Sequence, residues 1–116
     1  GGAIYGASVS VDLDGSTSFS GNLAADHGRT FALIGSDGYS ELLGVVFSNN
    51  TATFGGAVYR YNYLDYTSFT DATFQANSAK SSGGAVAVTE AYSIRCSSCS
   101  FLDNVASDDG GAVETL

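Results

Sequence analysis

Two acidic segments carry the residue types that acid–base catalysis uses. Residues 26–29 have the sequence Asp-His-Gly-Arg, and residues 108–110 have the sequence Asp-Asp-Gly. Paired carboxylates, helped by a histidine or a basic residue, are the groups with which many enzymes cleave polysaccharides. Whether the two segments can form one site depends on the distance at which the fold holds them.

Asp12 and Asp14 stand before Gly15 and resemble the start of a calcium-binding loop. An EF-hand loop ends in an acid at its twelfth position, which here is Leu23. The calcium-binding nonapeptide with two leading glycines is also absent from the sequence. We therefore interpret this segment as an Asp-rich turn, with weak calcium binding as the alternative.

Cys96 and Cys99 are the two cysteines of the chain and form a Cys-x-x-Cys pair. Such a pair can be a redox centre, half of a zinc site or a local disulfide. A second pair of zinc ligands and the βαβ pattern of thioredoxin are both absent from the sequence. An extracellular location favours a disulfide between the two residues, and we expect one. Two thiols packed in the core are the alternative.

Four tyrosines are candidates for a binding surface. Tyr59, Tyr61 and Tyr63 alternate along one predicted strand and therefore share a face. If Val58 points inward, that face points outward, and Tyr5 joins it from an earlier repeat. Exposed tyrosines stack on sugar rings and contact other proteins well. The alternative is a shift in parity that places some of these rings in the core.

Asn49 begins the sequence Asn-Asn-Thr, which is an N-glycosylation acceptor in a secreted eukaryotic protein. We expect this residue to face outward at a turn. It is therefore a candidate glycosylation site, and its use depends on the organism that makes the protein.

These candidate residues lie within an internal repeat. A Gly-Gly-Ala motif followed by an apolar residue recurs, and so does a Phe-x-x-Asn motif whose phenylalanines lie 28, 27 and 27 residues apart. A degenerate copy of the first motif, with Gly28 and Phe31 in place, fills its one gap. The complete copies are 1–4, 55–58, 83–86 and 110–113 for the first motif, and 19–22, 47–50, 74–77 and 101–104 for the second.

A repeat of about 27 residues with this composition predicts a right-handed parallel β-helix, a β-solenoid. The apolar spacing of amphipathic helices and the dense leucines of leucine-rich repeats are both absent. Strand-like runs at 7–13, 42–47 and 58–66 are separated by Gly, Ser, Asn and Asp, and 27 residues suffice for one closed coil of three short strands. We expect an all-β chain of about four coils, with repeats at 1–27, 28–54, 55–82 and 83–109 and the start of a fifth at 110–116.

Stacked coils place each repeated residue above its counterpart. We expect the phenylalanines to form an aromatic ladder inside the tube and the asparagines to form a hydrogen-bonded ladder at a turn. The glycine pair supplies a tight corner. The predicted ladders are Phe19, Phe47, Phe74 and Phe101, and Asn22, Asn50, Asn77 and Asn104.

The β-helix separates the two acidic segments. Both precede a glycine corner, but they lie three coils apart, which is about 14 Å at the strand spacing. The paired carboxylates of glycosidases lie about 5–9.5 Å apart. We therefore predict that the chain is not an enzyme, has no catalytic or metal site and needs no cofactor, and that His27 is an exposed turn residue. A polysaccharide-degrading enzyme is the least favoured alternative.

The composition of the chain argues against two classes of partner, nucleic acids and membranes. The chain has 116 residues, no Met and a net charge of −8, and such a charge repels a phosphate backbone, so we expect no nucleic-acid partner. No apolar run approaches the roughly 20 residues that cross a bilayer, so we expect no membrane insertion in this segment. Because Met is absent, we expect a processed product or a piece of a longer protein.

The alternation of Gly-Gly-Ala-Ile/Val with Phe-x-x-Asn resembles the repeats of the chlamydial polymorphic membrane proteins over nearly the whole chain. The resemblance implies a right-handed parallel β-helix displayed outside the cell, where chlamydial members act as adhesins secreted as autotransporter passengers. The second copy, which lacks a full Gly-Gly-Ala, departs from the family pattern.

We therefore expect a structural β-solenoid segment of an extracellular filament or cell-surface protein. The alternative function is an adhesin that binds glycans or a host receptor through its tyrosines. A solenoid presents unpaired strand edges at its ends. The expected partners are thus other copies stacked head to tail, or the continuation of a longer repeat array.

Overall fold

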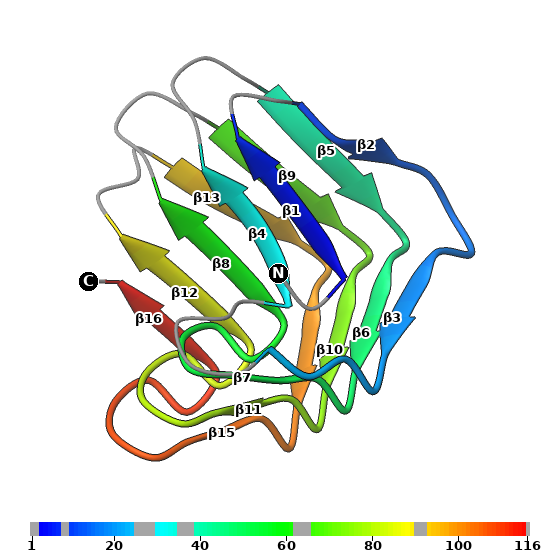
Figure 1. Cartoon of the computed structure of the whole chain (residues 1–116). Helices are drawn as coiled ribbons and strands as arrows, with labels where there is room; N and C mark the ends of the chain where they lie inside the picture. Colours follow the sequence, from blue (N-terminus) through cyan, green and yellow to red (C-terminus); the bar gives the residue numbers. More distant parts are fainter. Residues whose placement is uncertain are drawn as a thin grey trace.

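A computed structural model describes residues 3–7, 10–24, 30–34, 39–61, 66–89 and 93–115 (Figure 1). These residues form short strands and turns, and their strands pair in parallel. No helix among them is long and apolar enough to cross a bilayer. The prediction of an all-β parallel β-helix is confirmed.

The strands form four parallel sheets, here named A to D, and successive strands of one sheet come from successive coils. Sheet A contains β1 (Ile4–Ala7), β4 (Phe31–Ile34), β8 (Val58–Tyr61), β12 (Val86–Thr89) and β16 (Val113–Thr115). Sheet B contains β2 (Asp12–Leu13), β5 (Tyr39–Leu43), β9 (Tyr66–Thr70) and β13 (Ser93–Ser97). Sheet C contains β3 (Ser18–Ser20), β6 (Val46–Ser48), β10 (Thr73–Gln75) and β14 (Ser100–Leu102). Sheet D contains β7 (Thr51–Ala52), β11 (Ser78–Ala79) and β15 (Val105–Ala106), which Leu23 extends through a bridge to Thr51.

Each coil thus visits four sheets, one more than the three strands that the repeat length suggests. The predicted strand 42–47 is divided at Gly44, whose φ of 65° turns the chain from sheet B into sheet C. The predicted run 7–13 is likewise divided between β1 and β2. The strands of sheet D have two residues each, which is too short to leave a hydrophobic pattern in the sequence.

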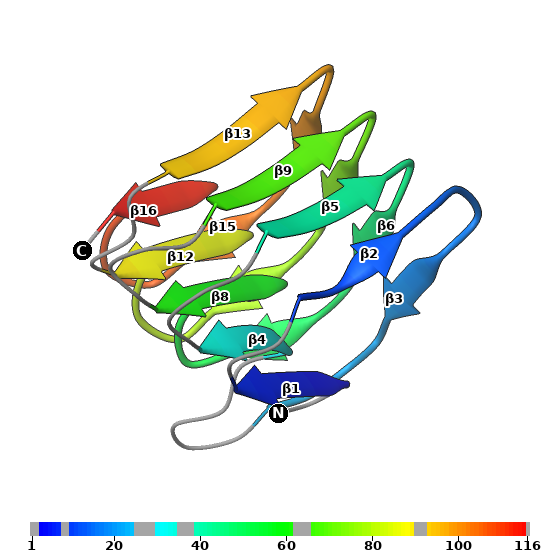
Figure 2. The same ribbon diagram turned by 90° about the horizontal axis from the view of Figure 1, so that it is seen from above.

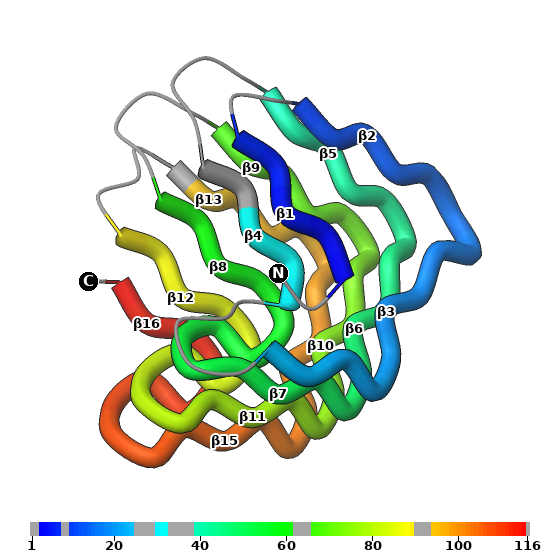
Figure 3. The backbone as a smooth tube through the Cα atoms, viewed as in Figure 1, coloured from blue at the N-terminus to red at the C-terminus, as the bar shows by residue number. Residues whose placement is uncertain are grey.

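Equivalent residues of successive repeats are register partners in neighbouring strands. Phe47 pairs with Phe19 on one side and with Phe74 on the other, and Phe74 pairs in turn with Phe101. Figure 2 shows sheets A and B as two rows of parallel strands, and Figure 3 shows the backbone following nearly the same path coil after coil. Columns of register partners therefore run along the molecule at the strand positions of the repeat.

Aromatic rings fill the middle of the tube. The rings of Phe19, Phe47, Phe74 and Phe101 stack in one column, with centroids 5.1, 5.2 and 4.8 Å apart. Phe31 meets this column edge-on at Phe47 (5.8 Å), and Phe69 meets it edge-on at Phe74 (5.4 Å). The two middle rings of the column are fully buried, whereas its two outer rings are half-buried. The apolar core therefore has its greatest coverage in the middle coils.

An asparagine ladder runs along the turn that follows sheet C. From each of the first three asparagines, Nδ2 donates a 2.9 Å hydrogen bond to Oδ1 of the asparagine in the following coil. That Oδ1 also accepts the backbone N–H of the earlier asparagine, at 3.0–3.1 Å. The bonds between asparagines therefore run in one direction, from donor to acceptor toward the C-terminal end. The side-chain amides of Asn50, Asn77 and Asn104 also donate to a phenylalanine carbonyl of the preceding coil. Its members are Asn22, Asn50, Asn77 and Asn104.

The residue before each asparagine has left-handed backbone geometry, with φ of 65° at Gly21, 54° at Asn49, 52° at Ala76 and 53° at Asp103. Ala76 is exposed and is the least suited of the four to this geometry, which glycine, asparagine and aspartate tolerate better. Ala76→Asn should therefore raise the free energy of unfolding by about 0.5–1 kcal/mol in urea denaturation.

Gln75→Asn is the matched control, because this exposed neighbour lies in a regular strand, where asparagine is disfavoured. It should leave stability unchanged or lower it. An equal gain from both substitutions would show that backbone geometry is not the cause.

Candidate functional site

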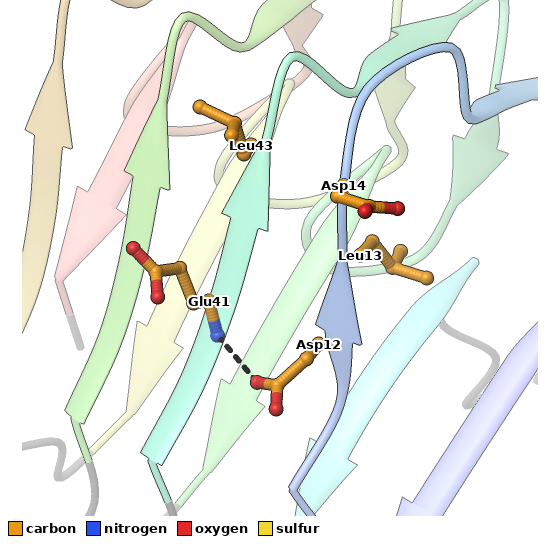
Figure 4. Close-up of a pocket in the computed structure, with 5 residues that line it drawn as sticks. All are labelled: Asp12, Leu13, Asp14, Glu41 and Leu43. Atoms are coloured by element: carbon orange, nitrogen blue, oxygen red, sulfur yellow. Dashed lines mark hydrogen bonds between the residues drawn. The ribbon is translucent and has the colours of Figure 1, made fainter.

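The outer surface of sheet B is hollowed at the end formed by β2 and β5 (Figure 4). The hollow has a volume of about 380 Å³ and is lined by Asp12, Leu13, Asp14, Glu41 and Leu43. Asp12 Oδ1 accepts the backbone N–H of Glu41 at 3.3 Å, and the three carboxylates point in different directions in Figure 4. Across the described ranges, no three His, Cys, Asp or Glu side chains form a group that could hold a metal ion. The hollow is an acidic patch on the surface.

The two segments with acid–base residues do not meet within the described structure. Segment 26–29, which includes His27, lies outside the described residues. Asp108 and Asp109 are exposed, and Asp108 Oδ2 accepts a 2.9 Å hydrogen bond from Ser81 Oγ of the preceding coil. The carbonyl of Asp109 accepts the N–H of Gly83 at 3.1 Å. These two hydrogen bonds connect the glycine corner at residues 81–83 with the corner at residues 108–110.

The tyrosine face expected on sheet A is smaller than the alternation suggests. Tyr5 is 58% exposed and Tyr61 is 39% exposed, but Tyr59 is only 5% exposed. The prediction that Tyr59 is available on the surface is wrong, because its ring packs at 6.4 Å from that of Phe54 and its hydroxyl donates to Thr89 Oγ1 at 3.3 Å. Tyr63 lies outside the described residues.

A different pair of tyrosines stacks on sheet B. Tyr39 and Tyr66 are register partners on sheet B, and their rings stack at 5.4 Å with planes 5° apart. Tyr39 is 51% exposed, and its strand also carries Glu41 of the acidic hollow two residues further on. The sequence analysis missed this pair, although its spacing of 27 residues matches the repeat.

Asn49, the candidate glycosylation site, is exposed at the turn after β6. Its neighbour Asn50 is fully buried in the ladder, so the two adjacent asparagines have opposite environments. Asn49 therefore faces outward at a turn, as expected.

Cys96 and Cys99 are both free thiols, so the expected disulfide is absent. Cys96 lies within β13 as the register partner of Phe69, and Cys99 Sγ donates to Phe69 O at 3.5 Å. Cys96 is exposed and stands in the register column of Phe69 and Leu42, whereas Cys99 is half-buried and packs against the core. The repeat, rather than a local cross-link, determines the place of this pair.

Although Cys96 is exposed, its thiol should react slowly, because its pKa is raised. Desolvation raises its pKa from the ordinary value of 9.0 to about 12, and the hydrogen bond and charge of Cys99 act in the same direction. At pH 8, iodoacetamide should label Cys96 more than about 100-fold more slowly in the folded chain than in urea, as followed by peptide mass spectrometry. Because the unfolded chain releases this proton first, the stabilising contribution is complete below pH 9 and is lost as the pH rises toward 12.

Cys99→Ala provides the control, since Cys96 is then the one thiol that labels. Equal rates in the folded and unfolded chains would contradict the raised pKa. A failure of both residues to label in urea without reductant would instead reveal a disulfide.

In the comparison with known proteins, one family model matches part of the chain. Residues 44–59 match the Chlamydia polymorphic membrane protein repeat, and they run from Gly44 through β6 and β7 into β8, so they contain one copy of each motif. Neither the curated proteins nor the solved structures contain a match. The chain is a β-solenoid with repeats similar to those of the Chlamydia polymorphic membrane proteins, and both features fit a segment of a surface protein.

Proposed function

We propose that this chain is a structural β-solenoid segment of an extracellular filament or cell-surface protein. The observation that carries the proposal is the unbroken stack of columns, in which aromatic rings and amides repeat from coil to coil at nearly constant spacing. Such a stack buries its polar and aromatic groups along one axis and makes a stiff rod. The likeness to a repeat of surface proteins, rather than of enzymes, supports the same role.

Surface labelling of intact cells tests this function. Antibodies raised against the folded chain should bind cells of the source organism without permeabilisation, and external protease should remove the signal. An antibody against a cytoplasmic protein is the control for leakage. Labelling that appears after permeabilisation alone would contradict an extracellular role.

A second candidate function is adhesion to glycans through the stacked pair Tyr39 and Tyr66. The exposed parts of the two stacked rings can contact the C–H groups of a sugar ring. Glu41, which lies on the same strand, supplies a carboxylate that accepts hydrogen bonds from hydroxyl groups. This arrangement favours sheet B over sheet A as the adhesive face.

Binding to a glycan array tests whether sheet A or sheet B is the adhesive face. If sheet B is adhesive, Tyr39→Ala and Tyr66→Ala should each reduce binding by about tenfold or more, equivalent to one or two lost stacking contacts. Tyr5→Ala and Tyr61→Ala on sheet A are the matched controls and should bind as the parent chain does. Loss of binding in the controls alone would place adhesion on sheet A, and a parent chain that binds no glycan would rule out this function.

A further inference from the structure

The outer face of β5 presents three different kinds of side chain in a row. Exposed and buried residues alternate along this strand, so Tyr39, Glu41 and Leu43 all point outward from sheet B. Tyr39 is 51% exposed and Leu43 is 42% exposed. This face lies on the side of the tube, where coils stacked along the axis do not cover it. An aromatic ring, a carboxylate and an aliphatic group therefore meet solvent at intervals of about 7 Å.

The tyrosine pair, Tyr39 and Tyr66, supplies the aromatic part of this face. The two rings stack at 5.4 Å, and Tyr66 is half-buried. Each ring covers part of the other, which leaves the exposed parts of both for a ligand. Aromatic rings contact apolar C–H groups and also attract cations, because the face of the ring is electronegative. A ligand with both C–H groups and a positive charge therefore gains from both interactions.

The carboxylate of Glu41 is available to a ligand beside the tyrosine pair. The backbone N–H of Glu41 donates to Asp12 Oδ1 at 3.3 Å, but no side chain in the described part of the chain donates to the Glu41 carboxylate itself. In Figure 4 the Glu41 side chain extends from β5 toward β9, the strand that carries Tyr66. Both of its carboxylate oxygens can therefore accept hydrogen bonds from a ligand that contacts the two rings.

The surroundings of Glu41 are acidic. Asp12 is its register partner on β2, and Asp14 follows that strand. Asp71 is exposed at the turn after β9. Arg95 is the one basic residue in the described strands of sheet B, and it stands two strands from Glu41. That separation is about 10 Å, beyond the screening length of about 8 Å at physiological salt. The face around Glu41 therefore attracts cations and repels anions.

From the tyrosine pair and the charge beside it, we propose that sheet B binds a cationic glycan, a chain of sugars that carry free amines. The C–H groups of a sugar ring contact Tyr39 and Tyr66, and the ammonium group donates to the carboxylate of Glu41. A neutral glycan makes the first contact without the second, and a glycan of uronic acids or sulfated sugars is repelled. The inference rests on the adhesive function proposed for sheet B and specifies the class of glycan.

The rigidity of an amino sugar favours a glycan over a basic peptide as the ligand. The amine of glucosamine is attached directly to the sugar ring, so one rigid group offers both the C–H surface and the charge. A lysine carries its charge on a flexible chain of four carbons, and binding must immobilise that chain at a cost in entropy. The close spacing of Tyr39 and Glu41 on one strand therefore suits the more compact ligand.

Two oligosaccharides with the same backbone and different charge test the proposal. They are the hexamer of β-1,4-linked glucosamine, whose amines are protonated at about pH 6, and its neutral N-acetylated form. Titration calorimetry with the folded chain at about 0.1 M salt should give a dissociation constant at least about tenfold lower for the amine hexamer. Raising the salt to about 0.5 M should remove most of this difference, because exposed charges are then screened.

Glu41→Gln tests the role of the carboxylate. The substitution keeps the shape of the side chain and removes its charge, so binding of the amine hexamer should weaken about fivefold or more, and binding of the N-acetylated hexamer by less than about twofold. Asp103→Asn is the matched control, because it removes the same charge from an exposed turn after sheet C, where asparagine tolerates the left-handed geometry. It should change both affinities by less than about twofold.

Each contrary result has a separate meaning. Equal affinities for the two hexamers would overturn the proposal and leave neutral glycans as the ligands of sheet B, whereas binding of neither would overturn the adhesive function as well. Equal losses in Glu41→Gln and Asp103→Asn would overturn it by showing that net charge, and not this face, attracts the ligand. A lysine hexamer should bind at least about fivefold more weakly than the amine hexamer. Equal or tighter binding would identify a basic polypeptide as the partner instead.

Discussion

Gly84→Ala should lower the free energy of unfolding by more than about 3 kcal/mol, whereas Gly111→Ala should cost less than about 1 kcal/mol. Both residues are the second glycine of a Gly-Gly-Ala corner, and both substitutions add the same methyl group. At Gly84 the methyl carbon would collide with the carbonyl oxygen of Gly111 and lie 2.7 Å from the backbone N and C of Val105. At Gly111 the nearest atom is the carbonyl oxygen of Asn104, at an ordinary contact distance of 3.8 Å.

The large cost at Gly84 follows from what surrounds it. The atoms in the way are backbone atoms of Gly111 and Val105, which cannot rotate aside as a side chain can. The coils would have to separate, and the hydrogen bonds from Gly84 N to Gly110 O and from Ala85 N to Ala112 O would lengthen. Urea unfolding of the two variants measures the difference. Equal losses at the two positions would show that the glycine pair is required for local flexibility rather than for the close approach of coils.

The main features of the fold could be predicted because a solenoid repeats its environment. Phe47 and Phe74 occupy the same position in neighbouring coils, so they meet the same demand for a flat apolar ring. The buried amides of Asn50 and Asn77 likewise need a partner directly above and below. Because each coil has the same environment at a given position, the same residue type recurs there in the sequence. The period of this recurrence alone indicates the β-helix.

Side-chain contacts that occur in a single coil leave no periodic pattern in the sequence. Tyr59 is buried because Phe54 of the preceding corner packs on it, and no other coil carries that pair. Arg60 is only 2% exposed because it stands two residues after the inward Val58, in a column where the next coil has Val88. Charge alone would have placed Arg60 at the surface. The strand alternation predicts its burial once the parity is known.

Some candidate site residues follow the repeat, and others depend on contacts within one coil. The stacked pair of Tyr39 and Tyr66 follows the repeat and could have been found from it, but the cluster at 59–63 drew attention to sheet A instead. The disulfide was expected from compartment and spacing, which act on two residues only. The register of β13 places Cys96 by its partner Phe69 instead. Reasoning from the columns is therefore more reliable in this molecule than reasoning from local motifs.

Asn77→Ala should lower the free energy of unfolding by about 3–5 kcal/mol, because it removes the centre of the ladder. Asn77 is 1% exposed, and its Oδ1 accepts the backbone N–H and the Nδ2 of Asn50 at 3.1 and 2.9 Å. Its own Nδ2 donates to Phe47 O at 3.0 Å and to Asn104 Oδ1 at 2.9 Å. The substitution leaves Asn50 and Phe47 with buried groups that water cannot reach, and each such group costs about 1–3 kcal/mol.

Asn104→Ala is the matched control at the end of the same ladder. Asn104 is half-buried, so water can replace part of what its side chain provides, and the expected loss is about 1–2 kcal/mol. Asn77→Asp adds a second comparison, since a carboxylate in this buried position must give up its charge. That variant should gain stability as the pH falls, whereas Asn77→Ala should not. If Asn77→Ala and Asn104→Ala cost the same, the ladder acts as separate surface turns, and the direction that it gives to the solenoid loses its energetic basis.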